Sequence, residues 1–332
     1  MERSIDRSGA PLTEAPPLSI AAVVPCYRET ARVLDVLARI GPEVARIFVV
    51  DDACPDGTGQ WVREHNRDPR VEVLFHDANR GVGGATVTGY RRALESGADI
   101  IVKLDGDGQM DPKLIPVLIK PLTLGEADYA KGNRFHDFGG LSAMPPIRLI
   151  GNIALSFATK VSSGYWDLFD PTNGYTAIHA KVARALPLDQ VSPSYFFESD
   201  MLFRLYLLRA VVADVPMRAR YGGEQSTLSI PRVIGEFALK HHCNAAKRIW
   251  HTYFLKNFTA ASIELAIGSA LLLFGTIFGL WQWSASIASG IPATAGTVVL
   301  AALPVILGVQ LLIAFLNYDV GNVPRRPIHP EL

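Results

Sequence analysis

The sequence predicts an α/β domain with a mostly parallel, doubly wound sheet, followed by interfacial helices and a C-terminal hairpin of two transmembrane helices. Three observations predict this class. Val- and Ile-rich runs alternate with amphipathic stretches over residues 19–108. Polar clusters stand where the apolar runs end, and in such sheets ligands bind at that edge. From Leu265 to Tyr318 the chain has no Asp, Glu, Lys, Arg or His.

Composition excludes several other classes. The length of 332 residues allows about two domains at ~150 residues each. Lys plus Arg equals Asp plus Glu at 32 each, so no bulk charge attracts nucleic acid. The three cysteines are far apart, which excludes a disulfide framework and a structural zinc site. The expected parts are a disordered lead-in (1–18), a catalytic domain (19–230), amphipathic juxtamembrane helices (231–258), two transmembrane helices (259–318) and a cytoplasmic tail (319–332).

The elements of the catalytic domain should alternate along the chain. We expect strands over 19–25, 44–52, 70–77 and 98–108, and helices over 29–40, 60–66 and 84–97. Gly41-Pro42 ends the first helix, and Asp111-Pro112 caps the helix after the fourth strand. Because the apolar runs are nearly continuous, both faces of the sheet should be covered.

The uncharged run is long enough to cross a membrane twice. At 1.5 Å per residue, Leu265 to about Trp283 spans ~30 Å of hydrocarbon, with Trp281 and Trp283 at the far interface. A short neutral linker follows, and about Thr297 to Tyr318 returns. A helical hairpin buried in a globular core is the alternative, which so long a run without one charge disfavours.

Basic residues stand before and after the two spans. The stretch 231–258 has apolar positions at helical spacing, and we expect its basic remainder to lie on anionic lipid rather than to form an ordinary solvated face. That remainder comprises Lys240, His241, His242, Lys247, Arg248 and Lys256. Arg325 and Arg326 follow the second span, and the loop between the spans has no charge, so the positive-inside rule puts the catalytic domain and the C-terminus in the cytoplasm, at the cell inner membrane. Because two spans bury little of their surface within one chain, the sequence is also consistent with lateral association into a homo-oligomer.

The segment KLDGDGQMDP carries the strongest chemical signal. Asp105, Asp107 and Gln109 alternate just beyond a buried strand, so an extended backbone points all three side chains to one side. Such oxygen ligands suit Mg²⁺ or Mn²⁺, with diphosphate oxygens and water completing the coordination. An EF-hand is excluded because Met110 and Pro116 replace the required Gly and Glu. A surface turn rich in Asp and Gly is the alternative.

Two further clusters lie at strand ends. Asp51 and Asp52 close the second strand, where a carboxylate either accepts hydrogen bonds from ribose or a base, or only terminates the strand. In NRGVGGA (79–85), Arg80 and the backbone N–H groups before a helix are candidates for binding phosphate. Neither common nucleotide fingerprint fits this segment, and its glycines are also consistent with close helix packing alone.

Together these segments resemble the inverting nucleotide-sugar glycosyltransferases with a GT-A fold, which is Rossmann-like, of the dolichol-phosphate mannose synthase type. VVPCYRE is similar to the opening VxPxYNE, VVDDACPDGTG to VDDxSxDGT, NRGVGGA to NxGxGxA, LDGDGQMDP to LDADxQxxP, and KGNRF to the GxR segment. The resemblance covers about residues 19–230 in the expected order. It implies a UDP- or GDP-linked sugar donor and a polyprenyl phosphate acceptor.

The resemblance also implies roles for single residues. Base and ribose would be held by Pro25, Tyr27, Glu29 and Asp52, and metal and diphosphate by Asp105, Asp107 and Gln109, with Asp107 counted among the catalytic groups. Arg134 matches the GxR arginine and Arg148 a second one, and both would face an acceptor phosphate, since a guanidinium contacts phosphate in a bidentate manner. The alternative for either arginine is a structural ion pair.

The chain departs from the family pattern at several positions. Arg28 stands where Asn is usual and Ala53 where Ser is usual. The RxxGxSK loop is only approximated by RYGGEQSTLS, where Arg220 and Ser226 are shifted in spacing and Thr227 replaces Lys. These last departures affect the acceptor side more than the donor side.

The segment SPSYFFESDMLFRL separates two mechanisms. Transfer to a sugar hydroxyl of a lipid-linked glycan needs a general base, and Asp200 of Glu198-x-Asp200 is the candidate. Transfer to a lipid phosphate needs little base assistance, because the nucleophile is already ionised. Both acids also suit the first turn of a helix, where they offset its dipole. We expect a membrane-anchored enzyme acting on polyprenyl phosphate; the hydroxyl acceptor and a non-catalytic membrane scaffold are the alternatives.

Overall fold

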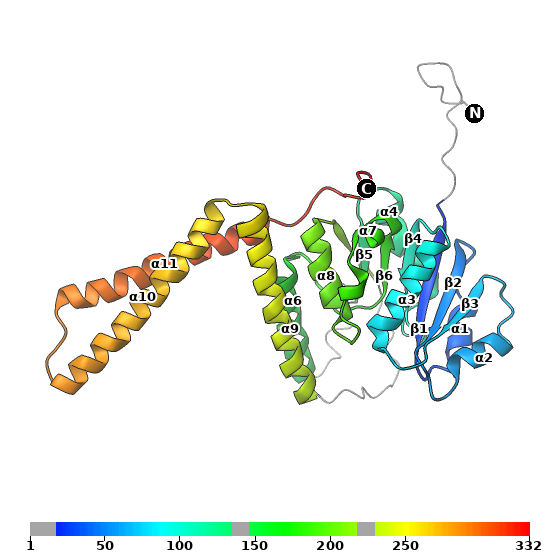
Figure 1. Cartoon of the computed structure of the whole chain (residues 1–332), viewed down its shortest axis with the longest axis horizontal. Coiled ribbons are helices and arrows are strands. Elements are labelled where there is room, and N and C mark those ends of the chain that lie inside the picture. The colour runs from blue at the N-terminus through cyan, green and yellow to red at the C-terminus, as the bar shows by residue number, and fades with distance from the viewer. Residues whose placement is uncertain (1–17, 135–145, 218–229) are drawn as a thin grey trace, which may run out of the picture. The chain divides into compact units, whose positions relative to one another are not determined.

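The computed structural model describes residues 18–134, 146–217 and 230–332 (Figure 1). By their internal contacts these residues fall into two compact units, each taken here by itself. The first unit comprises Met1–Lys131, Gly174–Ser194 and His329–Leu332, and the second comprises Gly132–Asn173 and Tyr195–Ile328. The chain therefore passes between the units several times, and the catalytic-domain boundary at residue 230 stays a prediction.

A mixed seven-stranded sheet has the order β3-β2-β1-β4-β6-β5-β7, and all of it except the end of β5 and strand β7 belongs to the first unit. Strands β1, β2, β3 and β4 run parallel, as predicted, whereas β6 is antiparallel to both β4 and β5. β1, β2 and β4 are buried almost throughout, consistent with their Val/Ile-rich sequences. The strands are β1 (Ile20–Cys26), β2 (Val44–Asp51), β3 (Val71–Phe75), β4 (Ile100–Lys103), β5 (Tyr129–Asn133) and β6 (Thr176–His179).

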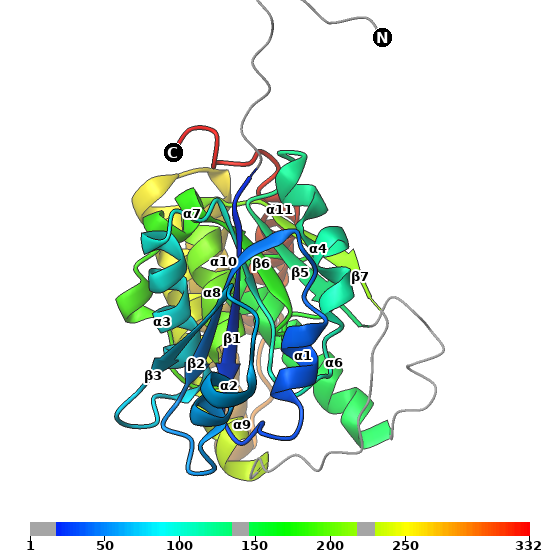
Figure 2. The same cartoon turned by 90° about the vertical axis from the view of Figure 1, so that its right-hand side faces the viewer.

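Helices cover both faces of this sheet: α3 and α7 pack on one face, and α1 and α4 on the other (Figure 2). Glycine lets α3 approach the sheet closely, because a Cβ on Gly89 would lie 2.2 Å from Val23 Cγ1. The first helix is shorter than predicted, since a turn occupies residues 29–32. The helices are α1 (Val33–Ala38), α2 (Thr58–His65), α3 (Gly81–Glu95), α4 (Ile115–Thr123) and α7 (Ala180–Ala185), with 3₁₀ turns η1 (Pro112–Leu114) and η2 (Leu188–Gln190).

The second unit is mainly helical. Strand β7 (Val212–Pro216) is followed by Met217, whose N–H donates to the carbonyl of Asn133 at the end of β5. Helix α6 packs against α8 and α9, and α9 continues into a π-helical turn. The helices are α6 (Pro146–Ser163), α8 (Phe197–Leu208), α9 (Ile230–Trp250), η3 (His251–Lys256), α10 (Ala260–Ser289) and α11 (Ala295–Gly321).

Helices α10 and α11 form an antiparallel hairpin, and both are long and apolar enough to cross a membrane. Each extends beyond the predicted span: α10 runs on past Trp283, and α11 ends three residues after Tyr318. Small residues bring the two backbones together. A Cβ on Gly275 would lie 2.8 Å from the Ala301 carbonyl oxygen, and one on Gly308 would lie 2.7 Å from the Leu272 nitrogen.

Helix α9 buries several polar side chains and exposes some apolar ones. His241, Asn244 and Arg248 are buried, whereas Leu239 and Trp250 are 65% and 57% exposed. The predicted basic surface was therefore wrong for His241 and Arg248, whereas His242, Lys247 and Lys256 are exposed. Hydrophobic periodicity locates the two faces of a helix, but it does not say which face packs on the protein.

The last residues of the chain belong to the first unit. The His329 backbone N–H donates to Asp128 Oδ1 at 2.8 Å, and the His329 ring nitrogen Nδ1 lies 2.8 Å from the same oxygen. The ring also stacks on His179, with centroids 4.4 Å apart. The predicted tail thus includes a segment that packs on the unit containing the sheet.

Candidate active site

The candidate site begins at the carboxyl ends of three neighbouring strands. In the sheet register Cys26 of β1 pairs with Asp51 of β2, and Val23 of β1 pairs with Lys103 of β4. Glu29, Asp52 and Asp105 follow these three strands directly or within a few residues. The first unit therefore brings the predicted donor-side residues to one edge, where parallel α/β sheets bind ligands.

Three carboxylates make this edge strongly acidic. The pKa of Glu29 is raised to about 7, first by burial and then by the charges of Asp107 and Asp105, with Arg32 opposing. Burial and the charge of Asp105 also raise the pKa of Asp107. Mutual repulsion of this kind is relieved when a cation binds among the carboxylates.

Lys103 is the nearest cation on the sheet itself. It is fully buried at the end of β4, and its Nζ lies 2.8 Å from Asp105 Oδ1. That oxygen is buried and has no hydrogen bond of acceptable geometry, so the contact is an ion pair only. Gly174 keeps the space open, because a Cβ there would lie 2.5 Å from Lys103 Nζ and 3.1 Å from Asp105 Oδ2.

The loop after β4 is shaped by its two glycines. A Cβ on Gly106 would lie 2.9 Å from Cys26 Sγ, and Gly108 has φ of +78°. Between them, Asp107 Oδ1 accepts a hydrogen bond from the Gln109 backbone N–H at 2.9 Å. The loop thus holds Asp105 and Asp107 in a fixed arrangement with Gln109 at its exposed end.

These residues fit a divalent cation. Two carboxylates close together on one loop suit a hard cation: within the described part of the chain Asp105 pairs with the Lys103 ammonium, and the pKa of Asp107 is raised. Among the described residues there is no group of three or more His, Cys, Asp or Glu arranged as metal ligands. The ion would therefore depend on Asp105, Asp107, the predicted ligand Gln109 and oxygens from outside the chain, which is the usual situation of Mg²⁺ with phosphates.

Asp52 lies at the predicted strand end, where its carboxylate is engaged within the protein. It is 3% exposed, and its carboxylate lies 2.7 Å from His76 Nδ1 and accepts from the backbone N–H groups of Arg80 (2.8 Å) and Gly81 (2.7 Å). Asp52 therefore fastens the glycine-rich loop to the end of β2. A role in holding base or ribose stays a prediction, and it would require this carboxylate to be shared.

The glycine-rich segment uses its N–H groups within the protein. Besides the two that bind Asp52, the N–H groups of Gly83 and Gly84 donate to the Pro193 carbonyl at 2.9 and 3.2 Å. The expectation that backbone N–H groups here meet a phosphate was therefore wrong for these four. The Arg80 side chain is exposed at the start of α3, so its predicted phosphate contact rests on the guanidinium alone.

The remaining donor-side residues lie on or near β1. Pro25 is buried within the strand and Tyr27 is 42% exposed just beyond it. Arg28 and Ala53 have φ of 64° and 53°. This left-handed conformation is better tolerated by Asn than by Arg, which gives the unusual Arg28 a physical cost.

In the second unit, Arg134 is held by a buried carboxylate. Its Nε and Nη2 donate to Asp170 Oδ2 and Oδ1 at 2.8 and 3.1 Å, and its backbone N–H donates to Oδ2 at 3.1 Å. Asp170 is fully buried, whereas the Arg134 side chain is 34% exposed. The ion-pair alternative is therefore realised, and it orients a guanidinium whose predicted contact with an acceptor phosphate stays a prediction.

Asp200 is also engaged in the second unit. It lies in the first turn of α8, where Arg204 Nε donates to Oδ2 at 3.0 Å and Asn244 of α9 donates to Oδ1 at 3.1 Å. These contacts link α8 to α9. They occupy both carboxylate oxygens of Asp200, which is not the arrangement of a free general base. Arg148 is on α6, but its side chain lies outside the described residues, as do Arg220, Ser226 and Thr227.

Sequence reasoning missed several residues that organise these sites. Lys103 carried a signal, because a lysine at the end of a buried strand needs an anionic partner. Asp319 carried another, as a carboxylate that directly follows an uncharged run. No such sequence signal marks Asp170 or His76, because the residues that they contact are far away in the sequence.

The raised pKa of Glu29 predicts a pH-dependent stability of the metal-free protein. A carboxyl whose folded pKa (about 7) exceeds its ordinary value of 4.5 stabilises the fold below pH 4.5, and this contribution is lost as the pH rises through 7. Thermal unfolding in EDTA at pH 5 and pH 8 measures it. We expect Tm to fall by about 2–4 °C more in the wild type than in Glu29→Gln, an estimate reduced for the partial exposure of Glu29. Equal falls in the two proteins would exclude this coupling.

Known proteins are similar in sequence to the part of the chain that holds the sheet. The profile of Glycosyl transferase family 2 matches residues 21–186. The undecaprenyl-phosphate mannosyltransferase of Micrococcus luteus is 34% identical over 204 residues, which are 60% of this chain and 83% of that protein. The UDP-N-acetylglucosamine–dolichyl-phosphate N-acetylglucosaminyltransferase of Methanococcus voltae is 29% identical over 61% of this chain and 86% of its own length.

A solved structure shows the same fold. Glucosyl-3-phosphoglycerate synthase from Mycobacterium tuberculosis, in complex with Mn²⁺, UDP and phosphoglyceric acid, superposes with a TM-score of 0.53 at 19% identity and covers 70% of this chain and 78% of its own. The chain therefore has a GT-A fold and belongs to glycosyl transferase family 2, so it is a glycosyltransferase.

Proposed function

We propose that this glycosyltransferase moves a sugar, with inversion, from a UDP- or GDP-linked donor to a polyprenyl phosphate at the cytoplasmic face of the cell inner membrane. The observation that carries the proposal is that one chain contains both a sheet edge whose carboxylates suit a divalent cation and a helical hairpin long enough to cross a membrane. The names of the two relatives, which act on undecaprenyl phosphate and dolichyl phosphate, support the acceptor class.

On the donor side, Asp105, Asp107 and Gln109 would hold Mg²⁺ or Mn²⁺ together with the diphosphate. The bound metal supplies neutralisation of the charge that develops on the leaving diphosphate. Lys103 holds Asp105 in place through their ion pair. Glu29 adds a carboxylate near the expected position of the ribose, and Tyr27 adds an exposed ring for the base.

On the acceptor side, a lipid phosphate fits better than a sugar hydroxyl. A hydroxyl acceptor requires a carboxylate that can take a proton, whereas Asp200 is bound to Arg204 and Asn244. A phosphate is already ionised and needs a cation to position it. Arg134, oriented by Asp170 and partly exposed, has that chemistry.

The membrane orientation follows from both ends of the hairpin. Lys247 and Lys256 precede α10, Arg325 and Arg326 follow α11, and all four are exposed. The contact of His329 with Asp128 joins the segment after α11 to the unit that carries the sheet, which supports placing both ends of the hairpin on one side of the bilayer. Self-association of the hairpins stays a prediction.

The test is a transfer assay with defined substrates. Detergent-purified protein is incubated with Mg²⁺ or Mn²⁺, a panel of UDP- and GDP-sugars, and undecaprenyl phosphate, and mass spectrometry detects the glycosylated lipid. We expect a metal-dependent sugar-phosphate-lipid product with one donor of the panel. NMR of the product determines the anomeric configuration and thereby tests inversion.

Two results would overturn the proposal. A protein that binds a donor but leaves undecaprenyl phosphate unmodified, while glycosylating a lipid-linked glycan, would establish the hydroxyl acceptor instead. A protein that shows no metal-dependent nucleotide binding would exclude the donor site at Asp105 and Asp107.

A further inference from the structure

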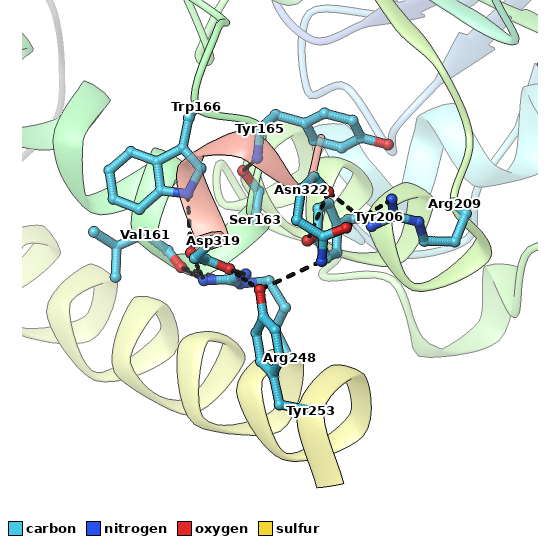
Figure 3. A network of polar contacts seen from close by, with 10 residues as sticks. All are labelled: Val161, Ser163, Tyr165, Trp166, Tyr206, Arg209, Arg248, Tyr253, Asp319 and Asn322. Carbon is cyan, nitrogen blue, oxygen red and sulfur yellow. Dashed lines mark hydrogen bonds and ion pairs between the residues drawn. The ribbon is translucent and has the colours of Figure 1, made fainter. Parts of the chain in front are cut away.

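The end of helix α11 carries a buried carboxylate that is fully engaged with its surroundings (Figure 3). Asp319 is 2% exposed and accepts four hydrogen bonds. Arg248 of α9 donates two, from Nη1 to Oδ1 at 2.6 Å and from Nη2 to Oδ2 at 2.9 Å. Tyr253 of η3 donates to Oδ1 at 2.6 Å, and the Trp166 indole donates to Oδ2 at 2.9 Å. One side chain at the end of a membrane-length helix therefore joins three other parts of the second unit.

The contact with Trp166 differs from the other two because Trp166 lies on neither α9 nor η3. It stands near the start of the segment 164–173, which has no regular secondary structure in its described residues. The Trp166 carbonyl also accepts from Lys160 Nζ at 2.6 Å, and its ring packs edge-on against Phe157 of α6, with centroids 6.2 Å apart. The start of this segment is thus fixed between α6 and the end of α11.

The same segment carries the carboxylate that holds Arg134. Four residues after Trp166, Asp170 makes its bidentate pair with the Arg134 guanidinium. Between them, the Phe169 backbone N–H donates to Asp214 Oδ2 at 3.1 Å, and Asn133 beside Arg134 donates to that oxygen at 3.0 Å. Trp166 and Asp170 therefore lie on one short piece of chain that contacts both the end of α11 and Arg134.

We propose that Trp166 and Asp319 are positioning residues for the acceptor-side arginine: they fix segment 164–173 to the end of the membrane hairpin, so that Asp170 holds Arg134 at a set place relative to the bilayer surface. This inference rests on the proposed function, because it takes Arg134 as the residue that meets the lipid phosphate. A lipid phosphate lies at a fixed depth in the bilayer, so its arginine has to be held with respect to the membrane helices.

The chain offers a matched pair of variants for the test. Trp166→Phe and Tyr253→Phe each remove one hydrogen bond to Asp319 and keep an aromatic ring, but only the first touches segment 164–173. Transfer is measured at varied undecaprenyl phosphate in mixed micelles of fixed detergent ratio, and donor affinity is measured separately by calorimetry with the nucleoside diphosphate. If Trp166→Phe folds poorly, Lys160→Met takes its place in the test, because it removes the hydrogen bond from Lys160 to the Trp166 carbonyl and so frees the same segment from α6.

For Trp166→Phe we expect KM for undecaprenyl phosphate to rise roughly tenfold with unchanged nucleotide affinity, and for Tyr253→Phe neither value to change. Hydrogen exchange in peptides covering 164–173 should accelerate in Trp166→Phe alone. Equal effects of the two variants on KM, or a wild-type KM in both Trp166→Phe and Lys160→Met, would overturn the inference. A wild-type protein with no transfer to undecaprenyl phosphate would instead overturn the proposed function.

Discussion

Replacing Asp107 with Asn is expected to lower kcat/KM for sugar transfer by about 10³-fold while leaving the fold intact or slightly more stable. The activity falls because a ligand of the charge-neutralising cation is lost at the position where charge develops. Stability does not fall, because Asn keeps an oxygen for the Gln109 N–H and removes a charge that raises the pKa of Glu29. Such opposite effects on activity and stability are typical of strained functional sites.

Steady-state transfer and thermal unfolding of the same preparation check this expectation. Asp35→Asn is the matched control, since Asp35 is a 76%-exposed acid of the same unit whose ion pair within the described part of the chain is a 3.7 Å contact with Arg39. Its activity should equal that of the wild type. An Asp107→Asn protein with activity within a few-fold of the wild type would show that Asp107 takes no part in the chemistry. A large fall in Tm would show that Asp107 is needed for the stability of the fold.

Replacing Arg248 with Met is expected to be the most destabilising single change in the second unit. It leaves the Asp319 carboxylate buried without its cation, and breaking a buried pair in this way costs about 3–5 kcal/mol. It also removes the donors to the Val161 carbonyl at the end of α6. The double variant Arg248→Met/Asp319→Leu should recover most of the loss, because no charge remains buried.

Thermal unfolding in detergent measures both variants against Arg209→Met. Arg209 binds the same end of α11, but its acceptors are the neutral carbonyl and side-chain oxygens of Asn322, so its loss should cost only about 1–2 kcal/mol. If the double variant is as unstable as Arg248→Met, packing rather than the unpaired charge explains the effect. If Arg209→Met is as unstable as Arg248→Met, the loss of any contact with this end of α11 explains the destabilisation, and the unpaired charge does not.

The features that could be predicted well from the sequence are those that depend on short stretches of chain. Strands β1, β2 and β3 end within two residues of their predicted ends, because polar residues follow their apolar runs, whereas β4 ends at Lys103, five residues before its predicted end. The cap at Asp111 forms as predicted, with its side chain accepting from the Lys113 N–H. Asp105 and Asp107 lie together at the strand edge because both belong to one loop.

What the sequence could not predict depends on encounters between distant segments. The insertion of β6 between β4 and β5, antiparallel to both, involves residues more than forty positions away from either strand. The contacts of Asp52 with His76 and the Gly81 N–H also join segments more than twenty residues apart. Arg248 was assigned to a basic surface because nothing local distinguishes an arginine facing anionic lipid from one that pairs with a carboxylate seventy-one residues later.

The participation of His329 in the first unit has a consequence for how the protein is made. Asp128 is synthesised long before His329, and both apolar helices, α10 and α11, leave the ribosome between the two. The sheet-bearing unit therefore gains the segment at His329 only after the whole hairpin has been synthesised. A chain interrupted anywhere before His329 lacks that closing contact, so the first unit is finished later than the hairpin that precedes this segment in the sequence.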